Sequence, residues 1–487
     1  MVLAIVLAYE ILSVFGVGII VRTMDKKSGG EGFVNAGRSM GTVMVGVTLA
    51  LTYLGSLHVF GVMELSWGIG MAAMWVSVGH VVMLSVICLF TGRWVRRTGV
   101  ETVPELLEKV GGPRVRVATS CANAAVVFGL LTMEAQCLGI VLAALTGLTI
   151  QQGAVIGGIL GIFYVFLAGM KEIGIINVVN TVVTFSGLIV TALVLGGVIP
   201  TDPATNLAGW DRVQHFFESS GGADKLKLLG TTGVIIAFGI PTLVATTFSQ
   251  SINQMGLQVC VAAKNERTVL KALIIAGVLN GAFTIFTVII GMASQAIPEI
   301  AALGPKLSGP GLIISYLPPW LVAWLCAAFL GALLSTFATN VLAPATLFVK
   351  DIYVSCTKST ESEAEQTKKI RIMIIILGII AVLVSFFLPE IVEGANWMFS
   401  WLIPGFWVLV FGLFWKRSKK AAEITLFGTW IVNFFWTFTP LKTVLGMEGV
   451  LNAYITLVLA LALGIITNIA LPGEPGLFRT QAAAWKA

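Results

Sequence analysis

Apolar segments about as long as a membrane is thick recur along almost the whole chain, and this feature leaves few folds open. Charged residues make up only 11% of the 487 residues, apolar residues make up 57%, and the mean hydropathy is +0.94. Soluble domains carry about 25% charged residues, so a soluble globular protein is excluded. A transmembrane β-barrel is also excluded, because its strands are short and alternating, whereas these runs are continuous over ~20 residues. The sequence therefore predicts an all-α polytopic membrane protein.

The apolar runs and the loop charges together predict the topology. We expect thirteen spans, at residues 2–21, 42–63, 69–91, 117–146, 152–169, 174–198, 231–260, 268–293, 317–347, 371–388, 395–415, 422–440 and 449–471. With the N-terminus outside, 25 of the 30 Lys and Arg residues fall on the cytoplasmic side and five fall outside, as the positive-inside rule requires. We therefore expect a multi-pass protein of a plasma membrane of the bacterial inner-membrane type, with the C-terminus in the cytoplasm.

Several classes of function are not supported by the motifs. The chain has no P-loop, no GxGxxG that opens a helix after a strand, no HExxH and no GxSxG, so we expect no enzyme. Its six cysteines show no metal-binding spacing and read as small packing residues. The net charge of +6 comes from short loops between spans, so it indicates topology and predicts no nucleic-acid partner. ATP-driven transport would need a partner chain, whereas secondary transport or a channel implies no obligate protein partner.

The second expected span is interrupted by polar and helix-weakening residues at mid-depth. Thr52, Tyr53, Gly55, Ser56 and His58 lie within seven positions. Backbone that leaves a helix inside a bilayer must be covered by protein or water, so such a break usually marks a site. A kinked helix whose small residues pack on a neighbour is the structural alternative.

Two further spans carry clusters of polar residues, TTFSQSINQ in the seventh span and LLSTFATN in the ninth. Hydroxyls beside freed carbonyls supply neutral oxygen ligands, which suit a weakly held monovalent cation. His58 and His80 lie on consecutive spans and can face one cavity, or can be satisfied core histidines. Glu134 can be a proton or cation ligand, or an acid hydrogen-bonded within the bundle.

At these clusters the sequence resembles the sodium:solute symporter family, the group containing sodium/glucose and sodium/proline transporters. The matching segments occur in order along nearly the whole chain: AGRSMG, GVMELSWGIG, ETVPELLEK, AGMKEIG, INQMGLQVCVAAKNE, LLSTFATNVLAPATLFVKDIY and IPGFWVLVFGLFWKR. The resemblance implies the leucine-transporter-like fold, with two inverted five-helix repeats whose first helices are broken. The implied organisation is an extra N-terminal helix and inner loop in 1–41, repeats in 42–198 and 231–415, an outer loop in 199–230, and two peripheral helices and a tail in 416–487.

The resemblance also carries site residues onto this chain. The family's sodium site falls on the carbonyls of Leu51, Leu54 and Ala332 and the hydroxyls of Ser335 and Thr336. The family's substrate-contact positions fall on His58, Ser77, His80, Thr246, Ser249, Gln250 and Asn396. The chain departs from the family at Ser249, where an aromatic inner gate would align, and at Asn177, where many relatives carry an Asp that helps a second sodium site. The resemblance with this departure predicts one sodium per cycle.

The expected function is a secondary-active symporter that uses the sodium gradient to import a small polar organic solute by alternating access. Helix N-termini exposed at the breaks and two histidines favour a carboxylic or amino acid over a sugar. The same residues could instead bind hydroxyls or an amine. The alternatives are a proton-coupled carrier that uses His58, His80 or Glu134, and a membrane sensor that kept the transporter fold. The sensor would need a signalling domain, which a tail of about sixteen residues after the last expected span does not provide.

Overall fold

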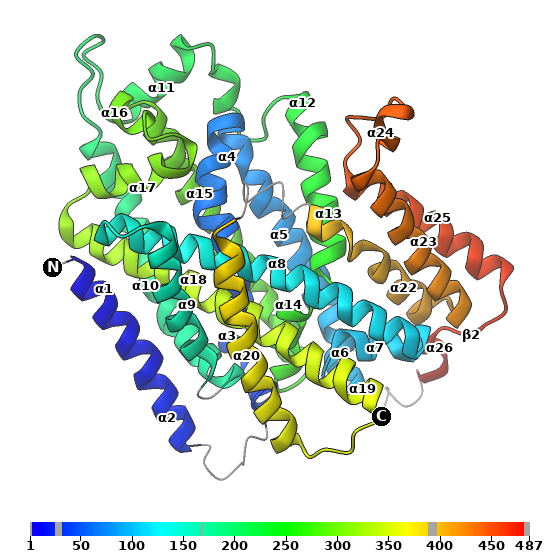
Figure 1. Cartoon of the computed structure of the whole chain (residues 1–487). Coiled ribbons are helices and arrows are strands. Elements are labelled where there is room, and N and C mark those ends of the chain that lie inside the picture. The colour runs from blue at the N-terminus through cyan, green and yellow to red at the C-terminus, as the bar shows by residue number, and fades with distance from the viewer. Residues whose placement is uncertain (1, 25–31, 167–168, 388–396, 482–487) are drawn as a thin grey trace.

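The computed structural model describes residues 2–24, 32–166, 169–387 and 397–481, which fold almost entirely into helices (Figure 1). Eight helices in these residues are long and apolar enough to cross a membrane. Within the described residues, helix also occupies each of the thirteen segments expected to span. The prediction of a helical, multi-pass membrane protein is confirmed. The number of spans and the side of the N-terminus stay predictions.

The first helical segment is continuous apart from one π-helical turn, and its beginning packs against α18 at the centre of the bundle. Its elements are α1 (Val2–Ile11), η1 (Leu12–Gly16) and α2 (Val17–Met24). The next group holds the first interrupted helix and two long helices. It comprises η3 (Ala36–Arg38), α3 (Thr42–Tyr53), η4 (Leu57–Gly61), α4 (Val62–Ile69), η5 (Gly70–Met74), α5 (Trp75–Val86), η6 (Ile87–Thr91), α6 (Gly92–Thr98), α7 (Val103–Gly111), α8 (Pro113–Thr146), α9 (Ile150–Phe166) and α10 (Met170–Val198).

A connection with its own short helices leads to the second interrupted helix. It contains α11 (Gly209–Ser219) and η7 (Ala223–Leu226). The group that follows comprises α12 (Thr232–Val234), η8 (Ile235–Gly239), α13 (Ile240–Gln250), α14 (Gln254–Ala262), α15 (Glu266–Gln295), α16 (Pro298–Ala301), α17 (Pro305–Tyr316), α18 (Pro319–Leu347), η9 (Phe348–Tyr353), α19 (Val354–Thr357), α20 (Glu363–Ser385) and α22 (Ile403–Phe414).

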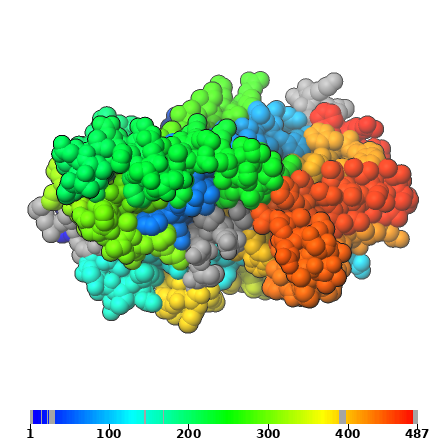
Figure 2. All heavy atoms as spheres, turned by 90° about the horizontal axis from the view of Figure 1, so that it is seen from above, coloured from blue at the N-terminus to red at the C-terminus, as the bar shows by residue number. Residues whose placement is uncertain are grey.

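The C-terminal segment packs two apolar helices beside α22 and closes with a short antiparallel strand pair. Its elements are β1 (Lys416–Arg417), α23 (Lys419–Phe438), α24 (Leu441–Val444), α25 (Asn452–Ala470), β2 (Glu474–Pro475) and α26 (Leu477–Gln481). Seen from above, these helices lie to one side of the rest (Figure 2). We call the end of the bundle that carries α11 and α12 the α11 face, and the end that carries α6 and α7 the α7 face (Figure 1).

Helix α18 forms the centre of the bundle and is buried along almost its whole length. Small residues let its neighbours come close. A Cβ built on Gly161 of α9 would lie 2.4 Å from the ring of Phe337, and one built on Gly331 would lie 2.9 Å from the Asn180 amide. Since lipid gives apolar helices no hydrophobic reason to associate, such close packing holds them together. The hydroxyl cluster of α18 is thereby fixed at the middle of the protein.

The first helix break separates α3 from η4. Leu54 leaves the helix with φ −95° and ψ 48°, and its N–H bonds the Leu51 carbonyl at 3.3 Å. After the break, the N–H groups of His58 and Val59 both donate to the Gly55 carbonyl at 3.0 Å. A side chain at position 55 has no space, because a Cβ there would lie 2.3 Å from Glu134 Oε1. The interruption is therefore a compact, protein-covered turn, as backbone at membrane depth requires.

The second break separates α13 from α14. The N–H groups of Ile252 and Asn253 donate to the carbonyls of Ser249 and Gln250, each at 3.2 Å. Asn253 then caps α14 by accepting from the Met255 N–H at 3.0 Å. Both spans predicted to be interrupted are therefore interrupted.

Candidate functional site

A carbonyl of the first broken helix meets a hydroxyl of α18. Thr336 Oγ1 lies 2.9 Å from Leu51 O and 3.0 Å from Ala332 O. Ser335, adjacent to Thr336 in α18, is fully buried, and its hydroxyl has no hydrogen-bond partner among the described residues. Three of the five residues expected to hold sodium are therefore in contact, and a fourth, Ser335, is their neighbour in sequence and has a buried hydroxyl.

The fifth residue, Leu54, lies in the break. In an unbroken helix its carbonyl would accept from the His58 N–H, which here donates to Gly55. No backbone N–H of the described residues donates to Leu54 O. These neutral carbonyl and hydroxyl oxygens suit a monovalent cation such as Na+. The described residues contain no group of three His, Cys, Asp or Glu side chains that could bind a transition metal.

Glu134 of α8 reaches the same break from the other side. Both of its carboxylate oxygens lie 3.0 Å from the Ser56 N–H, and Oε1 also accepts from the Ser56 hydroxyl at 2.9 Å. The N-terminus of a helix carries a partial positive charge, which favours an anion. Glu134 is 4% exposed, so this carboxyl caps the second half of the broken helix inside the protein. Of the two roles left open for Glu134, hydrogen bonding within the bundle is observed.

A small internal cavity of about 30 Å³ adjoins the first break. Helices α3, α8, α13 and α18 all contribute to its walls. The lining residues are Thr52, Tyr53, Gly55, Ser56, Leu57, His80, Leu130, Met133, Glu134, Gln250, Met255, Thr336, Asn340 and Phe399. Three buried polar atoms of this lining, on Thr52, Gln250 and Asn340, have no hydrogen-bond partner among the described residues. Buried polar groups are normally paired, so these atoms indicate a polar ligand or water.

The structure places the expected substrate residues in different surroundings. Two of them, His80 and Gln250, line the internal cavity. The His58 ring meets His80 edge-on, with ring centres 4.3 Å apart, and it also lies edge-on to Phe283, with ring centres 6.4 Å apart. Ser77 is bonded to α15 through the Asn280 carbonyl at 2.7 Å.

Two further expected contacts, Thr246 and Ser249, lie on α13. Thr246 and Ser249 are buried there, and the Ser249 hydroxyl has no partner among the described residues. Asn396 lies outside the described residues. Sequence reasoning did not propose Phe399 for the site, because an aromatic residue in an apolar span carries no distinguishing signal.

Polar contacts close the α7 face beneath the cavity. Gln254 Oε1 accepts from the Val103 N–H at 2.8 Å, and the Asn123 amide donates to Ile252 O at 2.9 Å. Asp351 accepts from Arg116 at 2.7 Å, and it also accepts from the Thr102 hydroxyl at 2.9 Å. Lys350 forms an ion pair with Glu101 on the same face. The backbones of Met40 and Ala263 form an isolated parallel β-bridge there. These contacts tie α14 to α7, α8 and the end of α18, so we call them the α7 latch.

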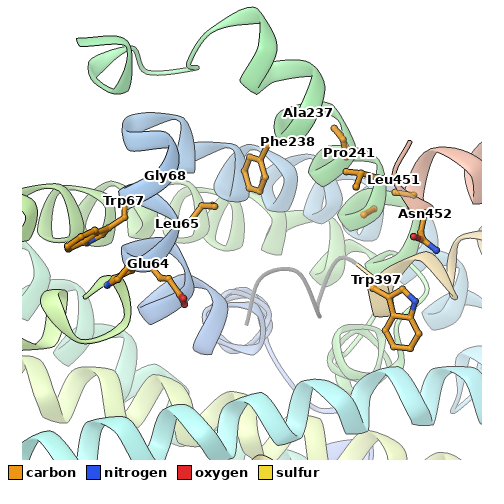
Figure 3. Close-up of a pocket in the computed structure, with 13 residues that line it drawn as sticks. Glu64, Leu65, Trp67, Gly68, Ala237, Phe238, Pro241, Trp397, Leu451 and Asn452 are labelled. Carbon is orange, nitrogen blue, oxygen red and sulfur yellow. The ribbon is translucent and has the colours of Figure 1, made fainter. Parts of the chain in front are cut away.

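The opposite side is hollowed by a vestibule of about 630 Å³ (Figure 3). It lies between α4, the α12–α13 helix, the segment that leads into α22, and the start of α25. Its lining residues are Glu64, Leu65, Trp67, Gly68, Ala237, Phe238, Pro241, Ala245, Pro305, Trp397, Leu451, Asn452 and Ala453. Along α13, Ala245 precedes Gln250 by five residues, a rise of about 8 Å. The vestibule therefore ends near the internal cavity. Since the α7 latch is closed, the protein is in a conformation that is open toward the α11 face.

Comparison with known proteins decides the family. The model of the sodium:solute symporter family matches residues 33–431. The chain belongs to this family. It is 23% identical to the uncharacterized symporter YidK of Escherichia coli over 83% of this chain and 73% of that protein. It is also 23% identical to the sodium/pantothenate symporter of Escherichia coli, over 84% of this chain and 85% of that protein.

The fold is similar to that of a solved transporter structure. A substrate-bound, outward-open Na+-coupled sialic acid symporter superposes with a TM-score of 0.81 at 17% identity, covering 97% of this chain and 98% of that one. The leucine-transporter-like fold is therefore confirmed, and the family consists of transporters and not of enzymes. Na+ is supported as the coupling ion.

Proposed function

We propose that this protein imports a small polar organic solute together with one Na+ per cycle, by alternating access. The observation that carries the proposal is the contact of Thr336 Oγ1 with Leu51 O, in a helix where Ser335 is also buried and next to a break where no backbone N–H of the described residues donates to Leu54 O. A cation bound there would join the first broken helix to α18. Since a cation that stabilises one conformation raises the affinity of a solute that prefers the same conformation, sodium and solute would promote each other's binding.

The one-sodium stoichiometry is supported by the surroundings of Asn177. In many relatives an Asp at this position helps a second sodium site, whereas here the Asn177 side-chain oxygen accepts from the Tyr164 hydroxyl at 3.1 Å. Asn180 donates to the same hydroxyl at 3.0 Å and accepts from Tyr9 at 2.7 Å. A neutral hydrogen-bond network thus takes the place of a second charged ligand set.

The remaining predictions belong to the same proposal. The two inverted repeats span 42–198 and 231–415, and each begins with one of the two broken helices. The α11 face is the outside of a bacterial-type plasma membrane, the N-terminus is outside, thirteen helices cross, and the C-terminus is cytoplasmic. Labelling single cysteines in 199–230 and 358–362 with a membrane-impermeant maleimide tests this topology. The first should react from outside and the second only after permeabilisation.

Transport in proteoliposomes tests the coupling. Purified full-length protein is given an inward sodium gradient or an inward pH gradient separately, with a panel of labelled amines, carboxylates, amino acids and sugars. Uptake driven by sodium alone is expected. Uptake driven only by the pH gradient would overturn sodium coupling in favour of a proton-coupled carrier using Glu134, His58 or His80. Absence of solute uptake under either gradient would favour the sensor alternative.

A further inference from the structure

We propose that the Glu134 carboxyl group is the acceptor that the transported solute faces in the central site, so that the solute presents a protonated nitrogen to it and not a carboxylate. This inference rests on the proposed transport function and specifies the charge of its solute. The sequence favoured a carboxylic or amino acid because helix N-termini at the breaks would offer unused donors. The structure shows what those donors bind.

Both N-termini are already capped by side chains. At the first break, the Ser56 N–H and hydroxyl donate to the Glu134 carboxylate. At the second, the N–H groups of Gln254 and Met255 donate to the side-chain oxygens of Asn123 at 2.9 Å and Asn253 at 3.0 Å. A solute carboxylate would have to displace these side chains, and at the first break it would do so beside a carboxyl group.

Several unused polar atoms around the cavity can accept a hydrogen bond. His80 Nδ1 lies 2.7 Å from the Val76 carbonyl and must donate to it, which leaves Nε2 as an acceptor in the neutral ring. Asn340 Oδ1 is buried without a partner, and the Thr52 hydroxyl can also accept. The unpartnered donors among the described lining residues are the Gln250 side-chain amide and the Thr52 hydroxyl, and the hydroxyl can accept as well. An ammonium group carries several donors and no acceptor, so it can bind the acceptors of His80, Asn340 and Thr52.

Aromatic rings and the absence of basic residues point in the same direction. Tyr53 and Phe399 line the cavity, and aromatic faces attract cations. Among the described residues, neither the cavity nor the vestibule is lined by Lys or Arg, and the charged residue of the vestibule is Glu64, beside Trp67. Figure 3 shows Glu64 and Trp67 on one side of this vestibule, Trp397 on the other, and Phe238 between them. A cationic solute would therefore meet aromatic and acidic groups in both the vestibule and the cavity.

The size of the cavity limits the part of the solute that it holds. One water molecule needs a cavity of about 10–15 Å³. The internal cavity of about 30 Å³ therefore accommodates only a small head group of the solute. The rest of the solute would extend along α13 toward the vestibule. Glu134 on one side and the Na+ ligands of Leu51 and Thr336 on the other would then place two cations around one carboxylate, which favours joint binding of sodium and an amine.

Thermal unfolding of the purified full-length protein in sodium buffer tests the inference with two matched series of probes. These are butylammonium, butanol and butyrate, and benzylammonium, benzyl alcohol and benzoate. An amine is expected to raise the unfolding midpoint, while the alcohol and carboxylate of the same skeleton leave it unchanged. The Glu134→Gln variant should bind that amine at least tenfold more weakly and keep the midpoint shift caused by sodium alone. Glu218→Gln, on the exposed surface of α11, is the matched control and should behave as the natural chain.

The outcomes separate the inference from the function that it rests on. The inference is overturned if neither amine raises the unfolding midpoint, whether or not a carboxylate or an alcohol raises it. Equal amine affinity in Glu134→Gln overturns it as well. In each case sodium-driven uptake of another solute would leave the transport function standing. If Glu134→Gln fails to insert, the panel measured on the natural chain still decides the solute charge.

Discussion

Thr336 of α18 touches the carbonyl of Leu51, at 2.9 Å, at the point where the first broken helix is about to unwind. The hydroxyl lies equally close to the Ala332 carbonyl of its own helix, so it bonds without a cation present. A Na+ entering between the two helices would replace this hydrogen bond with coordination by both oxygens. The contact between α3 and α18 is therefore where ion binding and helix position are physically connected.

Removing the two hydroxyls of α18 should weaken sodium activation. In Ser335→Ala/Thr336→Ala the site loses two of its five expected ligands. We expect the sodium concentration for half-maximal uptake to rise at least tenfold, which corresponds to about 1.4 kcal/mol. The measurement is solute uptake in proteoliposomes as a function of sodium. Thr191→Ala removes a hydroxyl that bonds only within α10 and should leave the sodium dependence unaltered. Unchanged activation in the double variant would disprove the site assignment.

A methyl group at the first break should abolish transport. In Gly55→Ala the new Cβ would lie 2.3 Å from Glu134 Oε1 and 2.7 Å from the Thr336 methyl group, so the carboxylate and α18 must both shift. We expect sodium-driven uptake to fall to background while the protein still inserts, as judged by its yield and gel-filtration profile. Gly197→Ala is the control, because nothing lies within 4 Å of its added methyl group. Normal uptake by Gly55→Ala would show that the turn tolerates a side chain.

Breaking the α7 latch should shift the protein away from the arrangement seen here. Asp351→Asn removes the charge that Arg116 and Thr102 contact. Disrupting a buried ion pair costs about 3–5 kcal/mol, so the closed α7 face should lose population. A cysteine at Leu65, in the vestibule, should then react several-fold more slowly with an impermeant maleimide. The exposed Cys121 and Cys356 are replaced by serine beforehand.

The exposed pair of Arg114 and Glu423 provides the control for the latch. Arg114 Nη1 and Glu423 Oε2 are 3.8 Å apart, and the Arg114 side chain is 81% exposed. Such an ion pair contributes little to the stability of a conformation. Glu423→Gln should therefore leave the labelling rate as it is in the parent. A rate in Asp351→Asn equal to that of Glu423→Gln would mean that the latch does not control the conformation.

Replacing Glu10 with an apolar residue should stabilise the protein without affecting coupling. Glu10 of α1 is fully buried, and neither carboxylate oxygen has a hydrogen-bond partner among the described residues. An unsatisfied buried polar group costs about 1–3 kcal/mol, more when charged. Glu10→Leu removes both unpaired oxygens, so it should raise the unfolding midpoint and leave the sodium dependence of uptake intact. A lower midpoint, or a change in sodium activation, would assign Glu10 a role that its surroundings do not indicate.

The membrane class and both helix breaks could be predicted from the sequence because each has a local physical cause. Continuous apolar runs need lipid, and Gly55 and Ser56 in such a run weaken a helix where its backbone needs cover. The pairing of Leu51 with Thr336 was expected only by resemblance, because the two residues are 285 positions apart and no local pattern records their contact.

The sequence by itself determined the helical multi-pass architecture, through the hydropathy of its segments, and the places where two spans unwind. Only the tertiary structure decided what those unwound ends bind. The same polar stretch is compatible with donors left free for a solute or donors capped from inside, and the difference depends on Glu134 of α8 and Asn123 reaching the breaks. Hydropathy depends on each segment alone, whereas hydrogen bonding depends on which distant side chains packing brings within about 3 Å.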